Sequence, residues 1–399
     1  MKISCITTQS DWASMFGNWG FPGVKFILDR CKTAGMKKVY WRVTDGGRMM
    51  YHSKIAEIEA EIDDNEGARH FYGNTGYTCV DYRGWDPLKT AVDYAHKIGL
   101  ELHAWMQVCE EDHPWGLLSR FAKENPQFLS KDRQGRDLRA HLGFAYPEVV
   151  EYKLALIREV LKYGVDGFLL DFVRFCGNTV PLLDEQGVAL YGYERPAVEA
   201  FERRYGVAPT ALKNNDPGWV KFRASYITDF VRKVSLELKK QPVKVPLGTY
   251  IPWKNSLRTW WDPAHDYQGN YQKAADYLKS WFYDVEAWAG QKLIDYICPD
   301  VWVKNGGGWK APAPGLIKRI ASYFRKSLRL SGDIGLCLSY YAWGTKPGAL
   351  RKGAQAAFEN GFDELILCES QGVERTTNYW LKPWDEVARL NKSLSEHKE

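Results

Sequence analysis

The feature that most constrains the fold of this chain is a regular alternation of short apolar segments with longer amphipathic segments. The short segments are rich in β-branched and other apolar residues, which is typical of buried strands, and the longer ones carry apolar residues at helical spacing. The alternation continues through the 399 residues. We predict strands at residues 3–7, 38–43, 100–106, 167–172, 246–250, 294–299, 334–339 and 364–368.

Amphipathic helices are predicted between these strands. Several of them are followed by a glycine, which readily adopts the left-handed conformation that ends a helix. These glycines are Gly35, Gly99, Gly164 and Gly361. The predicted helices cover residues 22–34, 87–98, 147–163, 219–240, 276–291, 315–329 and 347–360, and a last helix at 383–397 closes the barrel.

Strands separated by helices pair in parallel through right-handed crossovers, and eight of them close a barrel instead of an open sheet. We therefore predict an α/β fold, a (β/α)8 TIM barrel with long βα loops on its C-terminal face. One barrel of about 250 residues with long loops accounts for residues 1–399 as a single domain. The long loop insertions are expected at about 44–85, 106–146 and 173–218.

Charge and hydropathy exclude several classes of partner. The 54 basic and 49 acidic residues are interspersed, so the chain has no basic stripe for nucleic acid. The longest apolar runs are far shorter than the roughly 20 residues that span a bilayer, so no membrane partner is expected. Oligomeric state is not predicted by these features.

The start of the chain and its cysteines bear on location. Met1 leads straight into the first predicted strand, without the charged and apolar regions of a signal peptide. The 8 cysteines are scattered and include no C-x-x-C pair, which favours reduced thiols. We expect a cytoplasmic protein, the alternative being a periplasmic or secreted protein whose signal peptide has been removed.

Aromatic residues are the unusual part of the composition. The chain contains 17 Trp, 23 Tyr and 17 Phe. Aromatic rings pack against the apolar faces of sugar rings while their N–H and O–H groups bind hydroxyls, so a Trp-rich cleft suits a carbohydrate. Core packing is the alternative explanation for many of these rings.

Residues 165–175 read Val-Asp-Gly-Phe-Leu-Leu-Asp-Phe-Val-Arg-Phe, a short apolar strand that ends in polar residues. It delivers Asp171 and Arg174 at its C-terminal end. In parallel α/β proteins this end faces the mouth where reactive groups gather. Asp171 is therefore the first candidate for a catalytic residue, and the alternative is that it caps a loop or pairs with Arg174.

The other strand ends carry further polar and aromatic residues toward the same mouth. Asp300, flanked by Val301 and Trp302, follows the sixth strand, and Glu369 follows the eighth. Both are predicted catalytic carboxylates. The predicted substrate-binding residues are Arg42, Asp45, His103, Trp105, Glu110, Arg174, Tyr250, Trp253, Trp302, Tyr340 and Trp343.

Carboxylate chemistry is what remains after other mechanisms are compared. The 8 histidines include no H-x-H on a strand and no H-E-x-x-H, so no metal is expected. The chain also lacks a G-x-S-x-G elbow, and no G-x-G-x-x-G follows the first strand, so no cofactor is expected. A pair of carboxylates in an aromatic mouth suits glycoside hydrolysis.

In this mechanism one carboxyl protonates the leaving oxygen while the other attacks the anomeric carbon or activates water. We assign Asp171 as the nucleophile, since Arg174 and a polar mouth would keep it ionised. Asp300 is the first candidate for the acid because apolar neighbours raise the pKa of a carboxyl group. Glu369 is the second candidate. The alternatives are a loop-capping Asp300 and a salt bridge from Glu369 to Arg42 or Arg375.

Several motifs lie between residues 36 and 175. Residues 39–43 read Val-Tyr-Trp-Arg-Val, residues 51–53 read Tyr-His-Ser, and residues 100–105 read Leu-Glu-Leu-His-Ala-Trp. Residues 146–149 read Tyr-Pro-Glu-Val, and residues 166–175 read Asp-Gly-Phe-Leu-Leu-Asp-Phe-Val-Arg-Phe. The first two stretches resemble the second strand and following loop of the bacterial glycosyl-hydrolase-like 10 family, the third resembles its third strand, and the last two are similar to its later motifs.

The resemblance implies a (β/α)8 barrel assigned to carbohydrate hydrolysis. It matches Asp171 to the family's acidic residue, and Arg42, His103, Trp105 and Arg174 to site positions. Two departures stand out: residues 106–110 replace an Asn-Pro-Tyr-Arg, and Asp300 stands where the family has glutamine. By strand position alone, we expect an acid here to complete a pair on the fourth and sixth strands, the arrangement of α-galactosidase-like barrels.

The leading hypothesis is a glycoside hydrolase that cleaves an oligo- or polysaccharide by a retaining, two-carboxylate mechanism. The alternative is a catalytically silent barrel that binds carbohydrate through its aromatic mouth.

Overall fold

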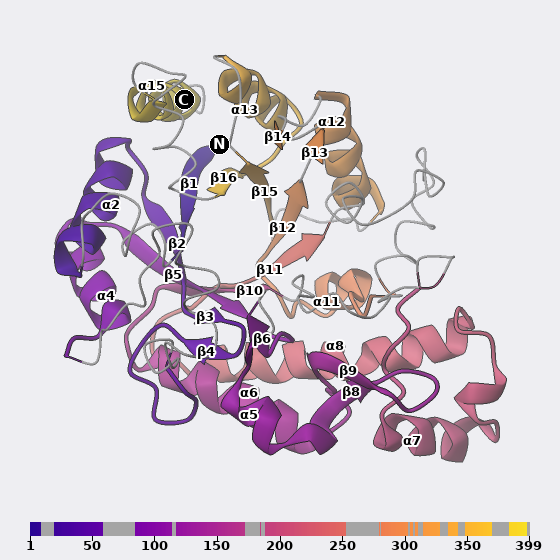
Figure 1. Cartoon of the computed structure of the whole chain (residues 1–399). Helices are drawn as coiled ribbons and strands as arrows, with labels where there is room; N and C mark the ends of the chain where they lie inside the picture. The colour runs from indigo at the N-terminus through magenta and orange to yellow at the C-terminus, as the bar shows by residue number, and fades with distance from the viewer. Residues whose placement is uncertain are drawn as a thin grey trace.

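Eight parallel strands close into a barrel in which neighbours along the chain are neighbours in the sheet (Figure 1). The strands are β1 (Lys2–Thr7), β2 (Lys38–Arg42), β5 (Glu101–Gln107), β10 (Gly167–Asp171), β11 (Leu247–Pro252), β12 (Tyr296–Val301), β15 (Gly335–Tyr341) and β16 (Glu364–Cys368). The computed structural model describes residues 1–8, 20–58, 84–113, 117–171, 184, 188–252, 279, 281–301, 304–305, 308–309, 314–327, 334–341, 348–368 and 383–396.

Helices form an outer layer around the strands (Figure 1). Asp86 and Asp216 begin two of them by accepting a hydrogen bond from a backbone N–H of the first turn. The helices are α2 (Phe21–Thr33), α4 (Pro87–Lys97), α5 (Arg120–Glu124), α6 (Pro147–Leu161), α7 (Arg195–Tyr205), α8 (Pro217–Lys239), α11 (Val285–Gly290), α12 (Pro314–Ser322), α13 (Ala349–Glu359) and α15 (Pro383–Glu396).

The predicted (β/α)8 barrel is confirmed, and each strand boundary lies within two residues of its prediction. The four predicted glycine caps, Gly35, Gly99, Gly164 and Gly361, all have φ between 71° and 78°. Two helices differ from their predictions. The described part of α11 begins at Val285, and α12 continues as the π-helix η5 (Tyr323–Ser327).

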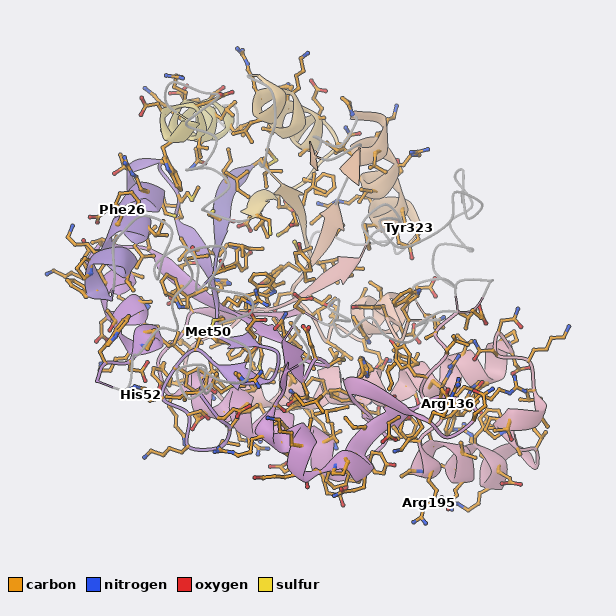
Figure 2. All side chains as sticks on the ribbon, viewed as in Figure 1. Phe26, Met50, His52, Arg136, Arg195 and Tyr323 are labelled. Carbon is orange, nitrogen blue, oxygen red and sulfur yellow. The ribbon has the colours of Figure 1, made fainter. Side chains whose placement is uncertain are left out.

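The long loops contain short secondary structure that the sequence did not predict. Hairpins form in the insertions after β2 and β5, and α7 lies in the insertion after β10. Phe201 of α7 packs edge-on against Trp219 of α8, while Arg195 points outward (Figure 2). The hairpin strands are β3 (Thr44–Asp45), β4 (Arg48–Met49), β6 (Asp112–His113), β7 (Leu117–Leu118), β8 (Leu129–Lys131) and β9 (Asp137–Leu142), with β13 (Lys304–Asn305) and β14 (Gly308–Trp309) after β12.

Side chains on the strands alternate between two cores. One face packs against the helices, and the other fills the barrel, where Tyr40, Trp105, Tyr250 and Tyr296 are buried together. Two glycines on neighbouring strands make room for rings at the N-terminal end. A Cβ on Gly167 would lie 2.3 Å from Nδ1 of His103, and one on Gly248 would lie 2.0 Å from the ring of Tyr296.

Gly248→Ala should therefore destabilise the protein. The added methyl would overlap the buried Tyr296 ring, and overpacking of this kind typically costs about 1–3 kcal/mol. Urea denaturation would measure the loss. Gly290→Ala is the matched control, because a Cβ there meets nothing within 4 Å and alanine favours the helix. Equal stability of the two variants would contradict the proposed packing.

Candidate active site

Asp171 ends β10 at the C-terminal mouth of the barrel, as predicted. It is 2% exposed and lies opposite Gln107 of β5 and Tyr250 of β11. The indole Nε1 of Trp105 donates a hydrogen bond to Asp171 Oδ2 at 3.1 Å. An N–H donor stabilises the charged form of a carboxylate. Asp171 is thus a buried acidic group whose orientation is set by a neighbouring strand.

Around Asp171 lies a layer of side chains that we call the mouth floor: Arg42, Trp105, Asp171, Tyr250 and Ser339. The guanidinium carbon of Arg42 lies 5.2 Å from the centroid of the Trp105 ring. The centroid of the Tyr250 ring lies 6.0 Å from that of the Trp105 ring. Tyr250 Oη shares a hydrogen bond of 2.8 Å with Ser339 Oγ. The floor thereby connects five strands of the barrel.

Arg42 and Asp45, both predicted site residues, form an ion pair with each other. Arg42 Nη2 donates to Asp45 Oδ1 at 2.6 Å, and Arg42 Nε donates to the carbonyl of Thr44 at 3.0 Å. Arg42 is 4% exposed and Asp45 is 9% exposed. The predicted cation at the end of β2 is therefore held in place by the turn that follows it.

Glu110 joins the site through Gln107, a residue that the sequence analysis missed. Gln107 Nε2 donates to Glu110 Oε2 at 2.9 Å, and Gln107 Oε1 accepts from the backbone N–H of Gly46 at 3.2 Å. Gln107 shares the inward alternation of Trp105 on β5, and this period of two was a signal that could have identified it. Glu110 is 2% exposed. A second buried carboxylate, that of Glu110, is therefore linked by a hydrogen bond to Gln107, the residue opposite Asp171.

A buried ion pair anchors the loop that carries Glu110. Lys153 Nζ of α6 donates to Glu111, which also accepts from Ser119 Oγ. The side chains of Lys153 and Glu111 are 1% and 0% exposed. The sequence does not predict this pair, because the two residues are far apart along the chain. The pair fixes this loop to the helix behind it.

His103 does not lie at the mouth, which corrects its predicted place in the site. It lies opposite Tyr40 and Gly167, at the N-terminal end of the barrel interior. Strands rise about 3.3 Å per residue, so four residues separate it from the level of Gln107 by about 13 Å. Its Nε2 is 3.4 Å from Glu101 Oε2, and burial lowers the pKa of its imidazole. His103 lines a separate cavity of about 390 Å³ at that end.

Trp105 and Tyr250 are covered residues of the floor. They are 1% and 3% exposed, so their rings do not form open surfaces for a sugar. The expectation that aromatic residues at the strand ends stack directly on substrate is therefore not met by these two. Their contacts with Asp171 and Ser339 give them a supporting place beneath the mouth.

The remaining predicted residues are only partly described. The backbone of Asp300 lies at the end of β12, opposite Pro252 and Ser339, and that of Tyr340 lies in β15. Nothing is described of these two side chains. Their roles stay predictions, as do those of the residues outside the described ranges, which are Arg174, Trp253, Trp302, Trp343 and Glu369.

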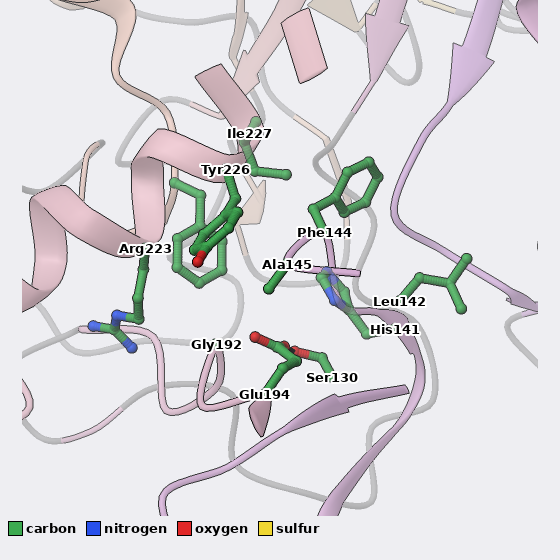
Figure 3. A pocket seen from close by; sticks show the side chains of 11 residues that line it. Ser130, His141, Leu142, Phe144, Ala145, Gly192, Glu194, Arg223, Tyr226 and Ile227 are labelled. Carbon is green, nitrogen blue, oxygen red and sulfur yellow. Dashed lines mark hydrogen bonds between the residues drawn. The ribbon is translucent and has the colours of Figure 1, made fainter. Parts of the chain in front are cut away.

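Beside this site, a small cavity of about 20 Å³ lies between the β8–β9 hairpin and α8 (Figure 3). Ser130, His141, Glu194 and Arg223 line it, and Ser130 Oγ donates to Glu194 Oε1. Burial raises the pKa of Glu194, while burial lowers the pKa of His141 to about 3. The cavity holds one water molecule at most, so it is too small for a sugar.

His141 should make stability depend on pH. In the unfolded chain a histidine takes up a proton near pH 6.5, whereas burial lowers the folded pKa of His141 to about 3. The unfolded state therefore binds more protons in this window, and stability should fall as pH decreases, by up to about 1.4 kcal/mol per unit. Urea denaturation between pH 7 and pH 5 measures the slope.

His141→Gln should reduce that slope. His96→Gln, at a half-exposed position, is the control for the loss of a histidine. An unchanged slope in His141→Gln would show that other groups cause the dependence.

Among the described residues, no group of three or more His, Cys, Asp and Glu residues is arranged to hold a metal ion. No helix in that part of the chain combines the length and apolarity needed to cross a membrane.

Comparison with known proteins adds to this geometry. The family model described as glycosyl hydrolase-like 10 matches residues 24–312, which is well over half of the chain. The chain belongs to the glycosyl hydrolase-like 10 family. The expected resemblance is thereby confirmed.

Two curated relatives illustrate the similarity. The chain is 24% identical over 285 residues to glycosyl hydrolase DigH of Escherichia coli K12, covering 69% of this chain and 56% of the relative. It is 26% identical over 239 residues to glycosyl hydrolase YngK of Bacillus subtilis, covering 56% of this chain and 40% of the relative. The chain spans about half the length of the curated relatives it matches.

Solved structures share the fold at lower identity. The glycoside hydrolase domain of PgaB (BpsB) from Bordetella bronchiseptica matches with a TM-score of 0.60 and 11% identity, covering 98% of both chains. The catalytic domain of β-amylase from Paenibacillus polymyxa matches with a TM-score of 0.56 and 11% identity, covering 95% of this chain and 97% of that one. These matches show a common barrel.

Proposed function

We propose that this member of the glycosyl hydrolase-like 10 family is a glycoside hydrolase that cleaves O-glycosidic bonds of an oligo- or polysaccharide. The observation that carries the proposal is Asp171, a buried carboxylate at the C-terminal mouth of the barrel held by the indole N–H of Trp105. Active sites of such barrels lie at this mouth. Family membership supports carbohydrate as the substrate.

In the proposed mechanism Asp171 attacks the anomeric carbon and forms a covalent glycosyl intermediate. The carboxyl group of Asp300 first protonates the leaving oxygen and then takes a proton from the water that releases the sugar. The backbone of Asp300 lies near the end of β12, two strands along the barrel from β10, which supports assigning both residues to the same mouth. Retention requires carboxyl groups about 5–5.5 Å apart.

A substrate screen tests the function. The protein would be incubated with a panel of polysaccharides and nitrophenyl glycosides, and the first product would be followed by ¹H NMR. We expect hydrolysis of at least one substrate with retention at the anomeric carbon. Inversion at the anomeric carbon would instead mean that Asp171 acts as a general base that activates water and not as the nucleophile. Binding of a glycan without turnover would support the catalytically silent barrel.

The general acid is tested by the leaving group. Asp300→Ala should retain activity on nitrophenyl glycosides for the first chemical step, because a good leaving group needs no proton, while natural glycosides should be hydrolysed far more slowly. Azide should then restore turnover, because it attacks the intermediate without a base. Glu369→Ala and Glu110→Ala are the matched comparisons. If one of these shows the dependence instead, the acid is that residue.

A further inference from the structure

The contact between Trp105 and Asp171 has a chemical direction. The indole nitrogen of tryptophan carries one N–H and can only donate a hydrogen bond. In the contact of 3.1 Å, Nε1 of Trp105 is therefore the donor and Asp171 Oδ2 is the acceptor. An ionised carboxylate accepts at both oxygens, whereas a protonated one loses acceptor capacity at the oxygen that holds the proton. The contact thus favours the ionised carboxylate and one orientation of it.

The indole plane that makes this contact is fixed on several sides. The guanidinium of Arg42 lies 5.2 Å from the ring centroid, and the Tyr250 ring lies 6.0 Å away. Arg42 is itself held by Asp45, and Tyr250 by Ser339. Trp105 is 1% exposed, so water does not compete for its N–H. A donor fixed before substrate arrives costs no reorganisation during the reaction.

We propose that Trp105 is a positioning residue that holds Asp171 ionised and in its attacking orientation through the indole N–H. The proposal rests on the proposed function for its catalytic meaning. Its structural content, a hydrogen bond that responds to the charge of Asp171, is independent of that function. Trp105 itself forms and breaks no bond to the sugar.

The sharpest variant removes only the N–H. Incorporating 3-benzothienylalanine at position 105 replaces the indole N–H by sulfur and keeps the bicyclic ring. The acidic limb of the pH–rate profile should move up by about one pH unit, because a hydrogen bond to a charged group is lost. The KM should stay within about twofold, since the ring is covered and makes no open contact surface.

Trp288 offers a matched control. Its ring is fully buried and its Nε1 donates to Thr228 Oγ1 at 2.9 Å, between α11 and α8. The same analogue at position 288 removes a buried indole hydrogen bond of similar length outside the mouth. We expect this variant to keep the wild-type pH–rate profile. A shift of equal size in both variants would mean that the effect is a general loss of packing and would overturn the proposal.

A second measurement needs no turnover. The indole ¹H–¹⁵N resonance of Trp105, assigned by its loss in Trp105→Phe, should shift as the protein is titrated through the acidic limb. In Asp171→Asn this titration should vanish. A resonance that does not respond to pH, or that titrates equally in Asp171→Asn, would overturn the proposed hydrogen bond.

The two measurements separate the two possible failures. If the wild-type protein hydrolyses no glycan but the resonance follows Asp171, the proposed function fails and the contact stands. If the protein is a hydrolase and the analogue at position 105 leaves the pH–rate profile unchanged, the function stands and the positioning role fails.

Discussion

Asp171→Asn should lower the rate of glycoside hydrolysis by on the order of 10³-fold or more, with little change in fold. The amide has nearly the shape of the carboxylate and can still accept the hydrogen bond from Trp105 through its oxygen. It has no negative charge to meet the developing oxocarbenium ion, and it is a poor nucleophile. The kcat on a natural glycoside and the thermal midpoint would be measured together.

Asp166→Asn is the control for this prediction. Asp166 lies just before the same strand, at its N-terminal end, where its carboxylate accepts from the backbone N–H of Leu102 and contacts His96. Its loss should change stability and leave kcat close to wild type. Wild-type activity of Asp171→Asn would remove Asp171 from the mechanism, and the carboxylate chemistry would have to be assigned to other residues.

Lys153→Met should destabilise the protein by about 3–5 kcal/mol, because it leaves the carboxylate of Glu111 buried without its cation. Both side chains are 1% exposed or less, and the Glu111 carboxylate also accepts a hydrogen bond from the hydroxyl of Ser119. The loss would be measured by urea denaturation. Because Glu111 neighbours Glu110 in the loop, activity should also fall at temperatures well below the melting temperature of the variant, where the protein is still folded.

The double variant Lys153→Met with Glu111→Leu tests the cause. Replacing both charges by apolar groups removes the uncompensated charge, and such replacements are often neutral or stabilising. We expect the double variant to be more stable than Lys153→Met alone. A double variant that is less stable than either single one would show that the pair contributes through its own attraction and not mainly through the penalty of breaking it.

Much of the fold was determined by local properties of the sequence. The eight strands and the four glycine caps were predicted close to where they occur, because period, helix ends and left-handed glycines depend on neighbouring residues. The same local reasoning placed Asp171 at the mouth, since the C-terminal end of a parallel strand is set by the topology. Arg42 and Asp45 were placed there for the same reason.

Other features of the site were decided only by the tertiary structure. His103 and Gln107 face the same interior from one strand, and the pairing of β5 with its neighbours places His103 beside Tyr40 and Gly167 and places Gln107 beside Asp171. Whether Trp105 is an open platform or a covered donor depends on Arg42 and Tyr250, which arrive from other strands. The Lys153–Glu111 pair joins a loop to a helix 42 residues away. The sequence alone determined which side chains reach the barrel, while contacts between distant strands determined their depth, partners and charge, because burial and hydrogen bonding are properties of the folded neighbourhood.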